Sequence, residues 1–133
     1  MFKRFRSTVE KIIVKHGHIS LKDFYASSNV TIKVQRPHFL DFVIEKTGNT
    51  IFVGYYRKQN GDLISDPIFV FEYREETEYG EDKWFPIRLE QVLDDRTVGL
   101  LVNEQYRYYP SAFKDVRSFA TNCATEWKAY YLE

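Results

Sequence analysis

The sequence predicts an α+β fold: an antiparallel meander sheet of five or six strands, flanked by N- and C-terminal helices. Three observations predict it. Apolar residues recur at helical spacing near both ends, they alternate with polar residues in between, and turn signals separate the alternating segments. Consecutive strands with short connections pair antiparallel, and the two helices can cover the face that such a sheet must bury. A chain of 133 residues suits a single domain, 1–133.

The first helix is predicted over residues 2–15. Five apolar side chains fall on one helical face: Phe2, Phe5, Val9, Ile12 and Ile13. Basic residues occupy much of the remaining surface, and Gly17 is suited to end the helix. A basic amphipathic helix can bind a membrane surface or an acidic partner. Because a stripe of this width needs only a core to cover it, we expect the helix to pack on its own domain.

The strands follow from alternation. Val30, Ile32 and Val34 predict a half-buried strand that ends before Pro37, since proline cannot donate to a ladder. Further strands are predicted at 40–45, 50–58, 68–73, 83–89 with a break at Pro86, and 97–102.

The segment 55–67, YYRKQNGDLISDP, holds two carboxylates, two cations and an Asn-Gly pair within thirteen residues. Asn60 and Gly61 are a strong hairpin signal because both residues tolerate positive φ. Asp62 and Asp66 are explained as turn residues, and their spacing does not fit a calcium loop. We expect a loop longer than two residues, with a bulge.

The second long helix is predicted over residues 111–131. Its apolar positions share one face: Phe113, Val116, Ala120, Cys123, Trp127 and Tyr130 or Tyr131. Pro110 and Ser111 form a plausible start, with the serine as the capping residue.

Composition restricts the function. The chain holds 19 basic and 19 acidic residues, and a neutral total argues against a dedicated duplex-DNA binder. Residues 1–40 carry eight Lys or Arg and two Asp or Glu, so the remainder is acidic. The two parts either compensate in the fold or polarise the molecule. Aromatic residues make up 17% of the chain, more than a small core needs, so some tyrosines should be partly exposed.

Reactive groups are few. Cys123 is the single cysteine, which excludes an internal disulfide, and its place on the apolar helical face predicts burial rather than catalysis. His16 and His18 would supply two metal ligands without a third. We expect no cofactor. No apolar run approaches the length that spans a bilayer, and no signal-peptide core follows the basic start, so we expect a cytoplasmic protein.

A metal-dependent nuclease is the least favoured of three functional hypotheses. Asp66 followed by Glu81-Asp82-Lys83 matches, in letters, the carboxylates and lysine that such enzymes place around Mg²⁺. However, Glu81 lies in an acidic, glycine-containing loop rather than inside a strand.

A second hypothesis is single-stranded nucleic-acid binding. Tyrosines that stack on bases, interleaved with cations that pair with phosphates, hold single strands without reading sequence. The segments YYRK and QYRYYP offer such contacts: Tyr55, Tyr56, Arg57, Lys58, Tyr106, Arg107 and Tyr108. The alternative for these residues is cross-strand packing with solvated cations.

The acidic segment EYREETEYGED, residues 72–82, supports the leading hypothesis. Six carboxylates within eleven residues could occupy a basic channel of a partner: Glu72, Glu75, Glu76, Glu78, Glu81 and Asp82. Tyr73, Tyr79 and Trp84 would serve as anchors, because these residue types dominate binding energy at interfaces.

A resemblance concerns residues 30–131. The strand DFVIE, the Tyr-Tyr strand, the turn NGDL, the Asp-Pro that opens the next strand, WFP at 84–86 and the final helix SFATNCATEWKAYYLE are similar to a family of uncharacterised small domains encoded by bacterial phages and mobile elements. The segment 93–108 departs from that pattern. The resemblance implies a mobile-element origin and an accessory role, and it transfers no catalytic residue.

Together these observations favour a non-enzymatic interaction protein. By analogy with small proteins from such elements, it would inhibit a host defence system, such as a CRISPR or restriction nuclease, by binding it. The expected partner is therefore a protein, in particular a host nucleic-acid-processing complex, with nucleic acid as the alternative and no membrane.

Overall fold

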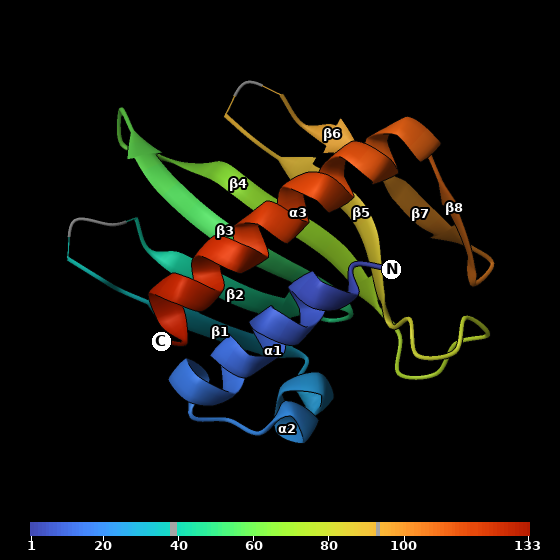
Figure 1. Cartoon of the computed structure of the whole chain (residues 1–133), viewed down its shortest axis with the longest axis horizontal. Coiled ribbons are helices and arrows are strands. Elements are labelled where there is room, and N and C mark those ends of the chain that lie inside the picture. The colour runs from blue at the N-terminus through green and yellow to red at the C-terminus, as the bar shows by residue number, and fades with distance from the viewer. Residues whose placement is uncertain (38–39, 93) are drawn as a thin grey trace.

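The protein has two layers: a six-stranded antiparallel sheet, and two long helices laid across one of its faces (Figure 1). The computed structural model describes residues 1–37, 40–92 and 94–133, and of residues 58–59 and 62–66 the backbone alone. Along the chain the elements are α1 (Lys3–Gly17), α2 (Leu21–Ala26), β1 (Asn29–Val34), β2 (Phe42–Thr47), β3 (Thr50–Gln59), β4 (Asp62–Tyr73), β5 (Trp84–Glu90), β6 (Arg96–Thr97), β7 (Gly99–Val102), β8 (Gln105–Tyr108) and α3 (Pro110–Tyr131).

The sheet order is β1-β2-β3-β4-β5-β6, with every neighbouring pair antiparallel. This confirms the predicted α+β meander between terminal helices. A second, two-stranded sheet of β7 and β8 lies beyond β5 (Figure 1). The sequence prediction missed β8 and joined β6 to β7 as one strand. Val98 separates those two strands: its N–H donates to the Ile87 carbonyl, and its own carbonyl accepts from Tyr109.

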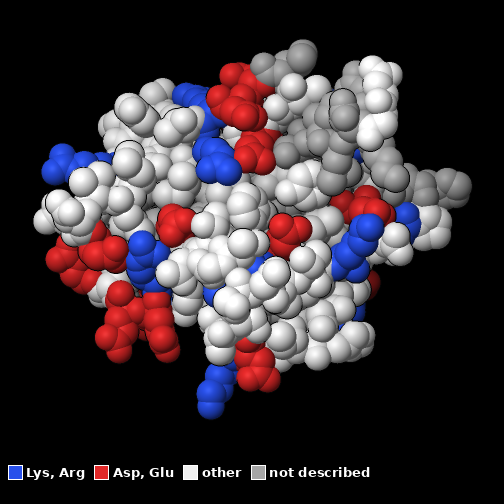
Figure 2. All heavy atoms as spheres, turned by 180° about the vertical axis from the view of Figure 1, so that it is seen from behind, with Lys and Arg blue, Asp and Glu red and all other residues white. Residues whose placement is uncertain are grey.

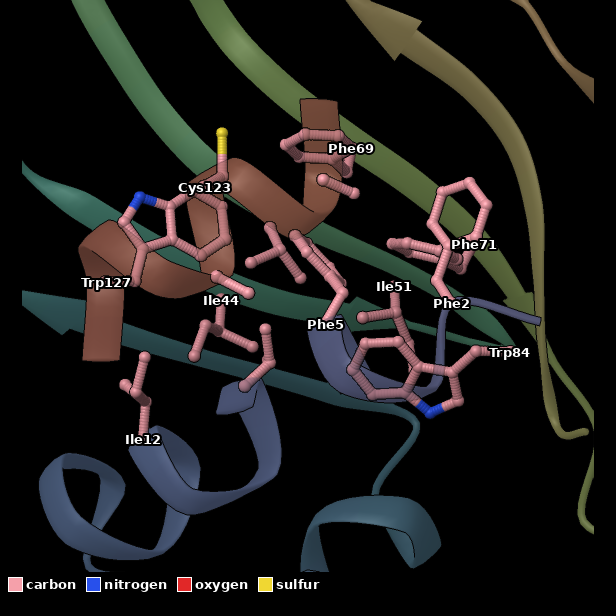
Figure 3. Close-up of a cluster of buried hydrophobic side chains, with 14 of the residues drawn as sticks. Phe2, Phe5, Ile12, Ile44, Ile51, Phe69, Phe71, Trp84, Cys123 and Trp127 are labelled. Atoms are coloured by element: carbon pink, nitrogen blue, oxygen red, sulfur yellow. The ribbon is translucent and has the colours of Figure 1, made fainter. Parts of the chain in front are cut away.

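The main core lies between the helices and the sheet, and aromatic rings fill much of it (Figure 3). Trp127 of α3 is 1% exposed and packs against Phe5 and Phe42, with ring centroids 5.3 and 4.8 Å apart. All five predicted stripe residues of α1 are buried, so this helix packs on its own domain as expected. On α3, Cys123 and Tyr131 are buried whereas Tyr130 is exposed.

The two long helices run in the same direction across the sheet (Figure 1). Near their starts, the rings of Phe2 and Phe113 are 5.3 Å apart. At the end of α1, His16 Nε2 lies 2.8 Å from the carbonyl oxygen of Tyr131. The two helices therefore lie beside each other over several turns, with a groove between them.

The central hairpin is longer and tighter than predicted. β4 begins at Asp62 rather than at residue 68, so Asn60 and Gly61 form a two-residue turn. The predicted irregularity lies instead within β3, where the register shifts between Gly54 and Tyr56. Gly54 faces the Pro67 carbonyl so closely that a Cβ atom would stand 2.0 Å from its oxygen. A glycine in mid-strand is thus explained by the close approach of another backbone.

Other boundaries differ for local reasons. Pro86 does not break β5, because it lies at a second register shift, where proline is tolerated. α2 was not predicted; Ser20 caps it by accepting a hydrogen bond from the Asp23 N–H at 3.1 Å. α3 is capped at Tyr109, with Pro110 in its first turn, so Ser111 is not the capping residue.

Candidate partner-binding surface

The connection between β4 and β5, residues 74–83, carries most of the predicted acidic residues; we call it the acidic loop. Its ends are held together by the Arg74 N–H, which donates to the Lys83 carbonyl at 3.0 Å. Gly80, at φ +70°, supplies a left-handed turn that other residues rarely adopt. The side chains of four glutamates project into solvent and make no salt bridge with any residue that the structure describes: Glu75, Glu76, Glu78 and Glu81.

The loop is fixed to the domain on both sides. On one side, the Arg6 guanidinium donates to the Glu81 carbonyl at 2.7 Å, and the amino group of Met1 forms an ion pair with Asp82. On the other side, the Tyr79 hydroxyl accepts from the Tyr106 N–H at 2.9 Å. The basic start of the chain and its acidic middle are therefore neighbours, and the start of α1 neutralises part of the loop.

Glu72 is also neutralised. Arg74 bridges it to the tip of the β7–β8 hairpin, with its guanidinium 3.1 Å from Glu72 and 2.8 Å from Glu104. The hydrogen bonds that Arg74 donates to Glu104 lower the pKa of the Glu104 carboxyl and raise the pKa of the Arg74 guanidinium. Of the six predicted carboxylates, Glu72 and Asp82 are thus paired, whereas the four glutamates of the loop remain available.

A groove separates the acidic loop from the hairpin tip. Its lining residues come from both segments: Glu76, Thr77, Glu78, Asn103, Glu104 and Gln105. Asn103 and Glu104 have φ values of 51° and 62°, as a tight two-residue hairpin turn requires. Seen from behind, Figure 2 shows acidic side chains gathered at the lower left, which corresponds to the right side of Figure 1, where this loop and hairpin lie. Much of the rest of that face carries neither charge.

Exposed apolar side chains gather on the same hairpin. Four of the seven large hydrophobic residues that are exposed in the described structure belong to it or follow it directly: Leu100, Val102, Tyr108 and Tyr109. We call this group the hairpin surface. Tyr109 is 57% exposed and Tyr108 53%, so the expectation of partly exposed tyrosines is confirmed. Exposed apolar residues beside charged ones are typical of interfaces.

Two of the three predicted aromatic anchors lie in the interior. Tyr73 is 7% exposed and stacks on Tyr25 with ring centroids 4.4 Å apart. Trp84 is 3% exposed, and only Tyr79 is half-buried. The prediction of Tyr73 and Trp84 as surface anchors is therefore wrong for this structure. The period of two from Phe69 and Phe71 already placed Tyr73 on the core face.

The residues of the nucleic-acid hypothesis do not form one surface. Tyr55 packs in the core, with its hydroxyl 3.1 Å from that of Tyr131, and Tyr106 is 8% exposed and donates to the Pro86 carbonyl. β3, with Tyr56 and Arg57, is separated by β4 and β5 from the hairpin that carries Arg107 and Tyr108. The side chain of Lys58 lies outside the described residues.

The groups considered for catalysis are dispersed. Cys123 is 7% exposed, as predicted, and burial raises the pKa of its thiol to about 12. Glu81 and Asp82 lie in the acidic loop, and the side chain of Asp66 is not described. Within residues 1–37, 40–92 and 94–133, no three His, Cys, Asp or Glu side chains are grouped as metal ligands. No helix in these ranges has the length and hydropathy needed to cross a bilayer.

The fold and this surface define a small α+β domain with a helix-covered meander and an acidic loop beside an apolar hairpin. Residues 7–128 match the family described as Domain of unknown function (DUF6908), and the chain belongs to that family. No curated protein and no solved structure gave a match.

Proposed function

We propose that this domain is a non-enzymatic interaction protein that binds a basic partner protein through the acidic loop and the hairpin surface. The observation that carries the proposal is the exposure of Glu75, Glu76, Glu78 and Glu81, which form no salt bridge with the described residues and lie next to exposed Leu100 and Val102. Unpaired carboxylates steer a cationic partner and suppress acidic ones. The apolar residues supply contact area that charges alone do not.

The anchoring of the loop supports a binding role. Three contacts hold the ends of the loop: those of Arg6 and Tyr79, and the backbone hydrogen bond from Arg74 to Lys83. The loop therefore loses little conformational entropy when its glutamates bind a partner. Its charge spacing suits a partner whose cationic channel ordinarily holds nucleic-acid phosphates. The resemblance to mobile-element domains favours a host nuclease of a defence system as that partner, which the domain would inhibit by occupying the channel.

The test is a charge reversal with a matched control. Glu75→Lys/Glu76→Lys/Glu78→Lys alters the acidic loop, whereas Asp94→Lys/Glu126→Lys/Glu133→Lys makes the same charge change at exposed sites elsewhere. Each variant is immobilised and incubated with a nuclease-treated bacterial lysate, so that capture bridged by nucleic acid is excluded. A protein that the wild type and the control capture should be lost, by about tenfold or more, with the loop variant.

The captured protein is then used to test whether the domain occupies a nucleic-acid-binding channel of its partner. Once purified, it should bind the wild type more weakly as salt rises, and a labelled oligonucleotide should compete with the domain for it. Equal capture by all three proteins would reject the acidic loop as the binding surface. If the captured protein binds the oligonucleotide and the domain at the same time, the proposal that the domain occupies the nucleic-acid channel is rejected.

A further inference from the structure

We propose that the groove between α1 and α3 binds the phosphodiester backbone of a nucleic-acid strand, independently of the acidic loop. The groove has a volume of about 390 Å³ and is lined by Lys3, Arg4, Ser7, Thr8, Lys11, Lys128 and Leu132. It lies on the outer side of the helices, away from the nucleic-acid residues considered from the sequence. Its four cations are exposed and make no salt bridge with any residue in the described ranges.

The first turn of α1 carries cations, which are unfavourable at the N-terminus of a helix. Lys3 and Arg4 stand at the positive end of the helix dipole, in a first turn that holds no acidic residue and has no side-chain cap. Lys3 also borders a pocket that Glu81 and Asp82 of the acidic loop line, whereas Arg4 does not. Cations at this end are unfavourable, and the free N–H groups there attract anions. A bound phosphate would offset both effects.

Thr8 gives an independent indication. The residue is 7% exposed and lines the groove, and its hydroxyl makes no hydrogen bond with any residue that the structure describes. The hydroxyl oxygen itself keeps contact with solvent, so it is accessible to a ligand. The hydroxyl can donate to a phosphate oxygen, and Ser7 beside it can do the same.

The arrangement favours a linear polyanion over one compact anion. Lys3, Ser7 and Lys11 follow each other at four-residue spacing, so they form a row about 12 Å long on one side of α1. Lys128 faces the row from α3. Cations in a row can contact successive phosphates, whereas a single phosphate needs them to converge. A lipid surface is less suited because Leu132 alone is apolar among the lining residues.

The proposal is tested by fluorescence anisotropy with a labelled DNA single strand of about 20 nucleotides, at KCl concentrations from about 50 to 200 mM. The wild type should bind, with a slope of log K against log[KCl] near −3 for four phosphate contacts. Lys11→Glu/Lys128→Glu should weaken binding about tenfold or more and make the slope shallower. Thr8→Val, which keeps the side-chain volume, should weaken binding about threefold.

The control Lys22→Glu/Lys33→Glu makes the same charge change on α2 and β1 and should bind within about twofold of the wild type. Circular dichroism verifies that each variant is folded. The proposal is overturned if the wild type does not bind the strand at about 50 mM KCl, or if both double variants lose affinity equally. Tighter binding to poly-glutamate or to vesicles of anionic lipid would overturn it as well. Reversal of the acidic loop should not weaken strand binding, so the two proposals can fail separately.

Discussion

Trp84 donates a hydrogen bond from its indole Nε1 to the Tyr25 hydroxyl, with 3.0 Å between the two atoms. Tyr25 in turn donates to Glu10 at 2.6 Å. This chain of two bonds joins β5 to α2 and α1, although Trp84 and Tyr25 are 59 residues apart in the sequence. Burial, and secondarily the Glu10 carboxylate, raise the pKa of Tyr25. The buried side chain of Trp84 therefore links the sheet to the helices through a hydrogen bond.

Tyr25→Phe should therefore destabilise the fold. The variant loses both hydrogen bonds and leaves the buried indole N–H of Trp84 without its partner, which typically costs about 1–3 kcal/mol. Urea unfolding monitored by tryptophan fluorescence gives the difference. Tyr109→Phe, at an exposed ring, should change the free energy of unfolding by less than about 0.5 kcal/mol. Equal stability of the two variants would show that the bond chain contributes nothing.

Gly54→Ala should be among the most damaging single substitutions. Its Cβ atom would stand 2.0 Å from the Pro67 carbonyl oxygen, and the backbone φ of +150° is one that alanine rarely adopts. Because β3 and β4 must separate to admit the methyl group, we expect a loss of about 3 kcal/mol or more, or no folded protein. Gly48→Ala is the matched control. It has positive φ but no atom within 4 Å, and should cost about 1 kcal/mol. A soluble Gly54→Ala variant with wild-type stability would contradict the close approach.

Stability should fall as the solution becomes alkaline. Burial raises the pKa of Cys123 from 9.0 to about 12, so between these values the unfolded chain releases a proton that the folded protein retains. The contribution is fully present below pH 9 and is lost as pH rises toward 12, at about 1.4 kcal/mol per pH unit. Burial also raises the pKa of Tyr25, Tyr55 and Tyr106, which extends the decline above pH 10.

Lys46 has the opposite effect on stability. Burial lowers its pKa, so the contribution of Lys46 to stability increases as pH rises toward 10.5. The groups whose pKa is raised outnumber Lys46, so the net effect of rising pH is a loss of stability. Urea unfolding at a series of pH values between about 8 and 11 measures it. Cys123→Ala should decline less steeply between pH 9 and 10. A free energy of unfolding that stays constant over this range would refute the expectation.

Arg74→Met should raise the pKa of the Glu104 carboxyl. Arg74 holds this carboxylate at 2.8 Å, and its hydrogen bonds keep the pKa of Glu104 below the ordinary 4.5. Methionine keeps most of the side-chain volume and removes the charge. An NMR titration of side-chain carboxyls follows the change, and Arg107→Met, on the opposite side of the same hairpin, should leave Glu104 unaltered. If Glu104 titrates identically in both variants, the bridge between β4 and the hairpin tip is absent in solution.

Much of the fold could be predicted because the signals were local. The stripe of α1, the alternation in β1 and β3 and the Asn60–Gly61 turn each depend on residues a few positions apart. The predicted length of this loop and the predicted position of the bulge were wrong, since the register of a hairpin depends on contacts along both strands. β8 was missed as an element, although cross-strand packing was the stated alternative for its tyrosines: Tyr106 packs on Phe85 of β5, and Tyr108 packs on Phe113 of α3.

The candidate surface was predicted in part. Glu75, Glu76, Glu78 and Glu81 are exposed, so they are available for the predicted role, which stays a proposal. The apolar component is Leu100, Val102, Tyr108 and Tyr109 instead of Tyr73 and Trp84. Alternation with Phe69 and Phe71 did indicate that Tyr73 is buried. The sequence could not indicate which residues of the β7–β8 hairpin are exposed, because that depends on which elements cover them.

By itself, the sequence determined the class of fold, the helix-covered face of the sheet, the burial of Cys123 and the position of the acidic loop. Each follows from periodicity or turn chemistry, which act over a few residues. Only the tertiary structure decided which carboxylates are neutralised, which aromatic rings are buried and where cations line a groove. These properties arise when segments such as the start of α1, the acidic loop and the end of α3 meet in space, because charge pairing and burial depend on distance in space and not on separation along the chain.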